Sequence, residues 1–286
     1  MAKVIGVHGI NQEYRGAHTI RAEWLPQLKD GLERAGCRLE SDEDFDCAFY
    51  GDFFREKAKA IAIPDYNEYD VDTEWEQELL VALWSGVAKA EEDIAGPNES
   101  STDKGFVSGA VHKALRALSR SNYFGGVAEK VVIHWLKQVG GYLHDPGLKR
   151  KIKDRVVESI SEDTRILVGH SLGSIVCYEV LCEHPEWPVE VFVSLGSPLG
   201  IQTLIFDRLD PAPKDGVGIW PGGVKHWVNI ADKDDIVALE KELDPLFQGT
   251  VKDWPVNNGI AVFAHSGGRY LTAQQTGEAI KLGLSQ

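Results

Sequence analysis

Short apolar runs alternate with amphipathic stretches near both ends of the chain. The runs end at glycine or polar residues, which is typical of buried strands, and they predict strands at 4–7, 46–50, 165–169, 189–195, 225–230 and 260–264. Apolar positions at helical spacing predict helices at 20–35, 174–182 and 271–284, and a helix or helical turn at 236–243. This alternation predicts an α/β fold with a mainly parallel sheet and helices on both faces.

The middle of the chain, residues 53–160, interrupts the alternation. It contains no convincing strand, and its pattern predicts helices at 73–90, 107–118, 127–142 and 148–160, with a loop at 96–102. We therefore expect a single domain, with its core in 1–52 and 161–286 and a helical insert or cap at about 53–160. Because the insert follows the strand at 46–50, it should pack near the carboxyl edge of the sheet, where α/β folds place their sites.

The composition allows a sizeable core and argues against one class of partner. Of the 286 residues, 43% are hydrophobic, and the net charge is −14 with a pI near 5.1. An acidic surface repels phosphate backbones and anionic membranes, so we expect no nucleic-acid partner. The one dense basic stretch, residues 149–153, is interpreted as a solvated helix face.

Cysteine usage and the absence of long apolar stretches indicate where the protein resides. The four cysteines form no CxxC pair and no metal-binding spacing, which favours a reducing compartment and no metal site; they are Cys37, Cys47, Cys177 and Cys182. The first residues are too short and too polar for a signal peptide. No stretch approaches the roughly 18 apolar residues of a transmembrane helix. The sequence predicts a soluble, cytoplasmic protein.

The segment "GHSLG", residues 169–173, places a serine between two glycines where a predicted strand gives way to a helix. A sharp strand–turn–helix bend of this kind exposes a nucleophilic serine, and its strained backbone needs small neighbours. Gly169 and Gly173 would supply them by letting the strand and the helix approach closely. Ser171 is therefore a candidate nucleophile, and a glycine-rich turn without chemistry is the alternative.

A second motif, "GVHGINQ", follows the first predicted strand and places a loop at the carboxyl edge of the sheet. The backbone N–H of Ile10 could there donate to a developing oxyanion, together with the N–H of Leu172 directly after the serine. Two such donors typically contribute a few kcal/mol each to the transition state. The side chain of His8 is interpreted as a packed histidine at the strand end.

A candidate acid lies in "VNIADKDDIVAL", where three aspartates follow a predicted strand. A carboxylate at this point could hold a histidine in the correct tautomer. Asp235, directly before an apolar pair, is the preferred residue, and Asp232 is the second choice. A solvated acidic loop is the alternative. Asp52, at the end of the strand at 46–50, is interpreted as a helix cap rather than a site residue.

The candidate base is His265, in "VFAHSGGRYL", in a loop after the last predicted strand and before the last helix. His134, His184 and His226 lie in or beside predicted elements and are interpreted as structural. Ser171, Asp235 and His265 then stand in the chain order Ser…Asp…His of α/β-hydrolases.

These motifs resemble those of the α/β-hydrolase superfamily, in particular serine esterases and lipases. "GHSLG" is its commonest elbow, "DIV" resembles the acid loop of fungal-type lipases, and "HSGGRYL" resembles their histidine loop. The block "WLKQVGGYLHDPGLKRKIKDRVVESI" resembles uncharacterised bacterial hydrolases with helical inserts. The resemblance covers 1–52 and 161–286. The common fold has two strands before the His-Gly strand, so the resemblance implies an α/β-hydrolase fold that lacks these edge strands.

The resemblance implies a serine hydrolase that cleaves a carboxylic ester through a Ser-His-Asp triad and an acyl-enzyme, without metal or cofactor. The expected substrate is a small-molecule or lipid-like acyl compound, whose acyl pocket the insert should line. An acyltransferase or thioesterase with the same triad is one alternative. A catalytically silent binding module is another. Aromatics of the insert are more often core than pocket; they are Trp75, Trp84, Tyr123, Phe124, Trp135 and Tyr142.

Overall fold

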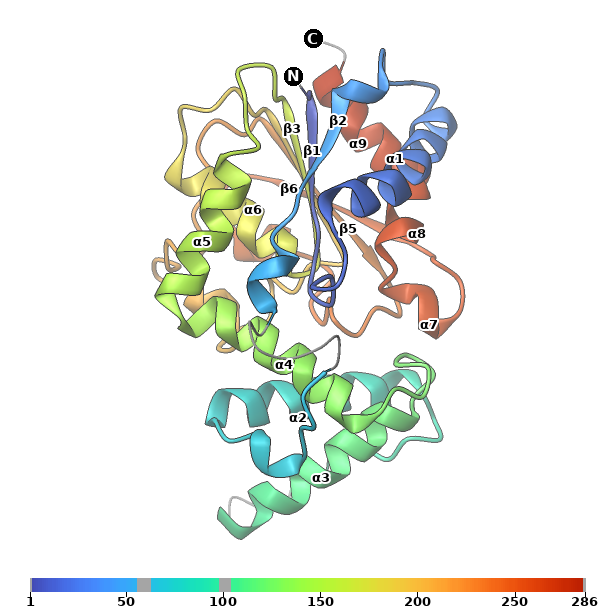
Figure 1. Ribbon diagram of the computed structural model, residues 1–286, viewed down its shortest axis with the longest axis vertical. Coiled ribbons are helices and arrows are strands. Elements are labelled where there is room, and N and C mark those ends of the chain that lie inside the picture. The colour runs from blue at the N-terminus through green and yellow to red at the C-terminus, as the bar shows by residue number, and fades with distance from the viewer. Residues whose placement is uncertain (1, 56–62, 98–103, 285–286) are drawn as a thin grey trace.

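A six-stranded parallel sheet forms the centre of the molecule (Figure 1). The computed structural model describes residues 2–55, 63–97 and 104–284, with side chains in the last range from residue 109. The strands lie in the order β2-β1-β3-β4-β5-β6 and all pair in parallel. They are β1 (Val4–Val7), β2 (Phe45–Ala48), β3 (Ile166–His170), β4 (Val191–Leu195), β5 (His226–Asp232) and β6 (Val251–Val256). The predicted α/β class and parallel sheet are confirmed.

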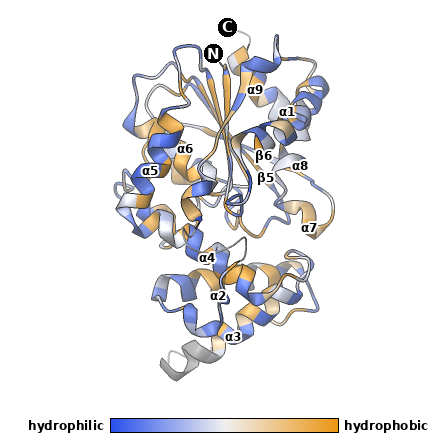
Figure 2. Ribbon diagram, in the orientation of Figure 1, coloured by the Kyte–Doolittle hydropathy of each residue, from blue (hydrophilic) through white to orange (hydrophobic). Residues whose placement is uncertain are grey.

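Helices cover both faces of the sheet (Figure 1). On one face lie α1 (Ala17–Arg34), α8 (Gly267–Thr272) and α9 (Gln274–Leu284); on the other lie α5 (Pro146–Val157) and α6 (Leu172–Glu183). Successive side chains of a strand point to opposite faces. Accordingly, Ile166 and Val168 of β3 pack in one apolar cluster with Leu28, whereas Leu167 packs in the other with Ile175. Figure 2 shows the strands as largely hydrophobic ribbons between helices of mixed character.

In the described part of the insert, three α-helices gather at the carboxyl ends of the strands, below the sheet in Figure 1. They are α2 (Glu74–Ala90), α3 (Lys104–Arg120) and α4 (Glu129–His144). Within the described part of 53–160 there is no strand, as the sequence predicts. The fourth predicted helix, α5, instead packs against α6 on a face of the sheet. In the described ranges, no helix combines the length and apolarity needed to cross a bilayer.

The strand predicted at 260–264 is wrong. Residues Ala261–Ala264 form a short helix, α7, and the last strand is β6. The apolar run around α7 is partly on the surface, with Ile260 68% exposed. β6 pairs on one side only, with β5, and it contains Pro255, which a sheet tolerates at an edge. The sequence of β6 therefore lacks the continuous apolar run that marks the buried strands.

Two helix predictions near the carboxyl terminus also need correction. Residues 236–243 form no helix, because the Asp235 carboxylate and the Lys241 ammonium bind backbone groups of this segment and hold it in an irregular loop. The helix predicted at 271–284 is two helices, α8 and α9, separated at Ala273. α8 begins earlier, directly after the segment that carries His265.

Candidate active site

Ser171 occupies a strained bend between β3 and α6. Its backbone angles are φ 54° and ψ −127°, in a region that non-glycine residues rarely adopt. A Cβ added at Gly173 would lie 2.2 Å from the carbonyl oxygen of Val7, and one at Gly169 would lie 2.6 Å from Cα of Ser174. Strand and helix therefore approach as closely as the two glycines predict, and the bend holds the serine at the carboxyl end of β3.

Asp235 and His265 form a hydrogen-bonded pair. Asp235 lies in the loop after β5 and is fully buried, and its Oδ2 lies 2.8 Å from Nδ1 of His265 and 2.7 Å from the hydroxyl of Tyr270. Its Oδ1 accepts the N–H of Val237 at 2.9 Å. A carboxylate can only accept, so Nδ1 of His265 carries a proton. The second nitrogen, Nε2, is then left as the basic atom.

The environment keeps Asp235 ionised despite its burial. Burial alone would raise the pKa of this carboxyl, but the neighbouring imidazole of His265 and hydrogen bonds from His265 and Tyr270 hold the pKa below its usual value. Tyr270 also accepts the backbone N–H of Asp232 at 2.8 Å. Tyr270 therefore connects the acid to the end of β5. No signal in the sequence had singled it out.

Asp232, the second choice for the acid, does not contact His265. It is fully buried, and its two oxygens accept the backbone N–H groups of Asp234, at 2.8 Å, and of Asn258. The side chain of Asn258 in turn donates to the carbonyl of Ala264 at 3.0 Å. Asp232 therefore ties together the two loops that carry the acid and the histidine.

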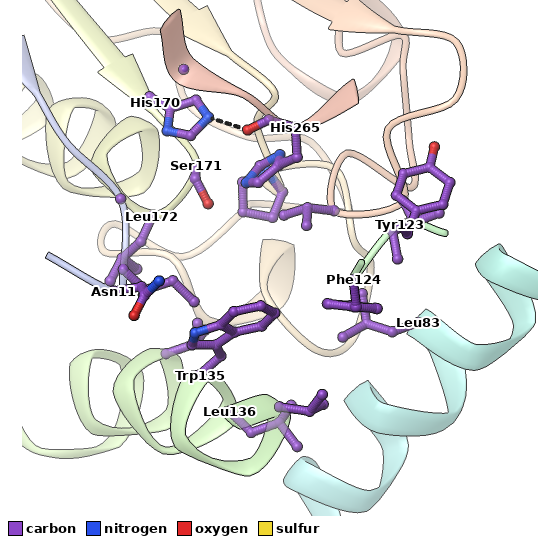
Figure 3. A pocket seen from close by; sticks show the side chains of 18 of the residues that line it. Asn11, Leu83, Tyr123, Phe124, Trp135, Leu136, His170, Ser171, Leu172 and His265 are labelled. Atoms are coloured by element: carbon purple, nitrogen blue, oxygen red, sulfur yellow. Dashed lines mark hydrogen bonds between the residues drawn. The ribbon is translucent and has the colours of Figure 1, made fainter. Parts of the chain in front are cut away.

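Ser171 and His265 line the same cavity, which has a volume of about 340 Å³ (Figure 3). Ile10 and Leu172 line it beside the serine, and in the ranges that the structure describes neither backbone amide has a hydrogen-bond acceptor. The rest of the wall is largely apolar and includes Leu79, Leu83, Phe124, Val132, Trp135, Leu136, Val139, Ile201, Ile205, Ile236 and Val262. The cavity is thus closed on one side by the insert.

His170, the last residue of β3, orients the segment of the candidate base, and no signal in the sequence points to this role. Its Nε2 lies 3.0 Å from the carbonyl oxygen of His265, and the two rings are 4.7 Å apart (Figure 3). The carbonyl can only accept, so Nε2 of His170 is the donor. Burial, with a smaller effect from the charge of His265, lowers the pKa of His170 to about 3. His170 is therefore neutral near pH 7.

His8 is a packed histidine at the end of β1. Its Nε2 accepts the N–H of Tyr50 at 3.1 Å and its Nδ1 lies 2.7 Å from the carbonyl oxygen of Gly9. Both nitrogens are therefore engaged by the backbone, which matches the structural role expected for this side chain. Burial lowers the pKa of His8 to about 4.

The low pKa of His8 predicts acid sensitivity. Below its ordinary pKa of about 6.5 the unfolded chain binds a proton that the folded chain does not bind, so stability decreases as the pH falls. We expect protonation of His8 in the unfolded chain to lower the free energy of unfolding by about 1 kcal/mol for each unit that the pH falls, between about pH 6 and pH 5. Urea unfolding of wild type and His8→Gln across this range measures the effect. An equally steep decrease in both proteins would contradict it.

Asp52 is neither a helix cap nor part of the cavity. The short 3-10 helix Gly51–Phe54 begins after Tyr50, so the predicted cap is wrong. The carboxylate of Asp52 instead lies 3.4 Å from Nη1 of Arg155 on α5. It links the start of the insert to the helix that covers the sheet.

Comparison with known proteins identifies no family. A scan against protein-family models finds no match for this sequence, and a search of curated proteins finds no significant relative. Over the described ranges, no group of three His, Cys, Asp or Glu side chains is placed to bind a metal ion. The fold itself, an α/β protein with six parallel strands, follows from the structure.

Proposed function

We propose that this protein is a serine hydrolase that cleaves carboxylic esters of apolar acyl groups. One observation carries the proposal: a serine in a strained strand–helix bend and a histidine that is hydrogen-bonded to the buried Asp235 line one apolar cavity. The positive φ of Ser171 costs stability, and residues held in such strained conformations cluster at active sites. Nε2 of His265, which lines the same cavity as Ser171, would supply the base that a serine hydroxyl needs.

The proposed reaction proceeds in two steps. His265 takes the hydroxyl proton of Ser171 at Nε2 as the oxygen attacks the ester carbonyl, while Asp235 stabilises the imidazolium. The amides of Ile10 and Leu172 donate to the oxyanion. His265 then protonates the leaving alcohol, and the bond between the carbonyl carbon and the alcohol oxygen breaks. In the second step a water molecule, deprotonated by His265, releases the acid and restores the serine.

The cavity favours an acyl group that is mainly hydrocarbon. Its volume of about 340 Å³ is at the small end of the 300–1,000 Å³ range typical of small-molecule sites. Its wall on the insert side consists of aliphatic and aromatic side chains. Burial of apolar area there would contribute roughly 25 cal/mol per Å² to binding. A short or medium acyl chain, or one aromatic ring, suits such a site.

A panel of p-nitrophenyl esters with acyl chains of graded length tests the proposed function. Wild type should hydrolyse them with a maximum at intermediate length, and Ser171→Ala should not. Adding an alcohol acceptor and analysing the products distinguishes hydrolysis from acyl transfer. Equal release of p-nitrophenol by wild type and Ser171→Ala would contradict the proposal.

The aromatics of the insert are expected to fall into two groups. Trp75 and Trp84 are about 5–6% exposed, and each donates its indole N–H to a backbone carbonyl. Phe124 and Trp135 line the cavity, with ring centroids 5.4 Å apart. Alanine at Trp75 or Trp84 should cost about 3–5 kcal/mol of stability and lower the melting temperature. Alanine at Phe124 or Trp135 should shift the ester preference toward longer chains.

Melting temperatures and chain-length profiles of the four variants check this division. The two variants of each group act as controls for the two variants of the other group in both measurements. If all four variants lose stability equally and keep the wild-type profile, the insert is scaffold and the acyl group binds elsewhere.

A further inference from the structure

We propose that Gln138, on α4 of the insert, is a positioning residue that holds the loop of Ile10 in the conformation needed for oxyanion binding. The inference rests on the proposed function. We use the name oxyanion loop for residues 9–12, which follow β1 and line the cavity. The insert then has a role in the chemical step in addition to forming the acyl pocket.

The contact is a hydrogen bond between elements 127 positions apart in the sequence. Oε1 of Gln138 accepts the backbone N–H of Asn11 at 2.8 Å. Gln138 is 2% exposed, so water competes little for this bond. In Figure 3, Asn11 lies beside Leu172 and Trp135, at the end of the cavity where Ser171 is found.

The orientation of the Gln138 amide is fixed by its surroundings. A backbone N–H can only donate, so the atom that faces Asn11 must be Oε1. The NH₂ group then faces Glu13 and His134. Oε2 of Glu13 accepts from it at 3.1 Å, and Nε2 of His134 lies 2.8 Å from it and 2.8 Å from Oε1 of Glu13. Burial would raise the pKa of Glu13, but hydrogen bonds from His134 and Gln138 hold it below its usual value. An ionised, buried Glu13 thus anchors the glutamine.

The oxyanion loop needs such an anchor because its backbone is strained and closely packed. Asn11 has φ 62°, a left-handed conformation that asparagine adopts more readily than most residues but less readily than glycine. A Cβ at Gly9 would lie 2.8 Å from Cβ of Ser171, and one at Gly51 would lie 2.6 Å from the carbonyl oxygen of Gln12. The bond to Gln138 fixes the peptide plane between Ile10 and Asn11. The Ile10 N–H belongs to the preceding peptide plane, between Gly9 and Ile10, so the bond restrains its direction relative to the serine through the φ and ψ angles of Ile10.

Gln138→Met tests the proposal, because methionine has a similar length and shape but accepts no backbone hydrogen bond of comparable strength. The readout is the rate constant for covalent labelling of Ser171 by a fluorophosphonate, whose phosphoryl oxygen must enter the oxyanion site. We expect this rate constant, and kcat for p-nitrophenyl esters, to fall about 10- to 100-fold, with KM nearly unchanged. Labelling should still reach completion.

The matched control is Gln77→Met on α2, which removes a side-chain bond to the carbonyl of Val71 away from the cavity. It should label at the wild-type rate. If Gln138→Met does not fold, Gln138→Asn serves instead, since its shorter side chain cannot reach Asn11 while its polarity is kept.

The outcomes separate three cases. Slower labelling that reaches completion supports the positioning role. Incomplete labelling at the wild-type rate constant means that Gln138 only stabilises the fold, and the inference is then wrong. The inference is also wrong if Gln138→Met changes neither the rate constant nor the extent of labelling. If wild type itself is not labelled at Ser171, the proposed function fails and this inference fails with it.

Discussion

Asp235→Asn should lower kcat for ester hydrolysis by about 10⁴-fold while the protein stays folded. The reason is the fixed orientation of the new amide. Oδ1 of Asp235 accepts the N–H of Val237, so the amide oxygen of asparagine would keep this position and its NH₂ would face His265. His265 would then have to accept at Nδ1 and carry its proton at Nε2. In that tautomer it cannot take the proton of Ser171.

Asp232→Asn is the matched control for this prediction. It makes the same chemical change three residues away, at a buried carboxylate that binds only backbone N–H groups. Loss of one of these bonds should lower the free energy of unfolding by about 1–3 kcal/mol, with a much smaller decrease in kcat. Steady-state kinetics and thermal melts of both variants decide between the two residues. A severe loss of kcat in Asp232→Asn with a mild one in Asp235→Asn would reverse the assignment.

Ser171→Ala should have the largest effect, lowering kcat by about 10⁶-fold toward the rate that binding and the oxyanion donors alone support. The change should leave the proposed acyl pocket intact, because the apolar wall of the cavity comes from other residues. Binding of a nonhydrolysable ester analogue, measured by calorimetry, should therefore stay near the wild-type affinity. Ser85→Ala, on the insert, is the control and should leave both quantities unchanged. Residual turnover within tenfold of wild type would contradict a covalent role for Ser171.

The sequence predicts the elbow well because its signal is local. The spacing of Gly169 and Gly173 reports a backbone approach that any side chain would block, so the motif and its bend can be recognised from five residues. The position of His265 late in the chain also predicts it as the candidate base, and the structure places it against Asp235. The strand predicted just before it is, however, the short helix α7.

The error around α7 has a physical cause. A short apolar run has the same pattern whether it lies in a buried strand or on a surface turn, and only its neighbours in the fold decide. Phe263 is 40% exposed in this run. The true last strand, β6, contacts a neighbour on one side only, so much of its surface is polar or exposed. Its sequence therefore carries little of the strand signal.

The groups that surround the candidate site could not be predicted because they come from distant segments. Tyr270 reaches Asp235 across 35 positions, and Gln138 reaches Asn11 across 127. No spacing rule connects such pairs, since they depend on how the insert and the last helices pack. Asp232 and Asp235 are both fully buried, so burial does not distinguish them. The choice between them depends on which carboxylate the packing of the last helices brings to His265.

The most direct measurement of the central claim is the site of covalent labelling by a fluorophosphonate. Wild-type protein is treated with the reagent and examined by intact mass spectrometry, and the modified peptide is then sequenced. We predict one adduct per chain, on Ser171, that forms slowly in Asp235→Asn and does not form in Ser171→Ala. An adduct that persists in Ser171→Ala, or a wild-type protein that the reagent leaves unmodified, would contradict it.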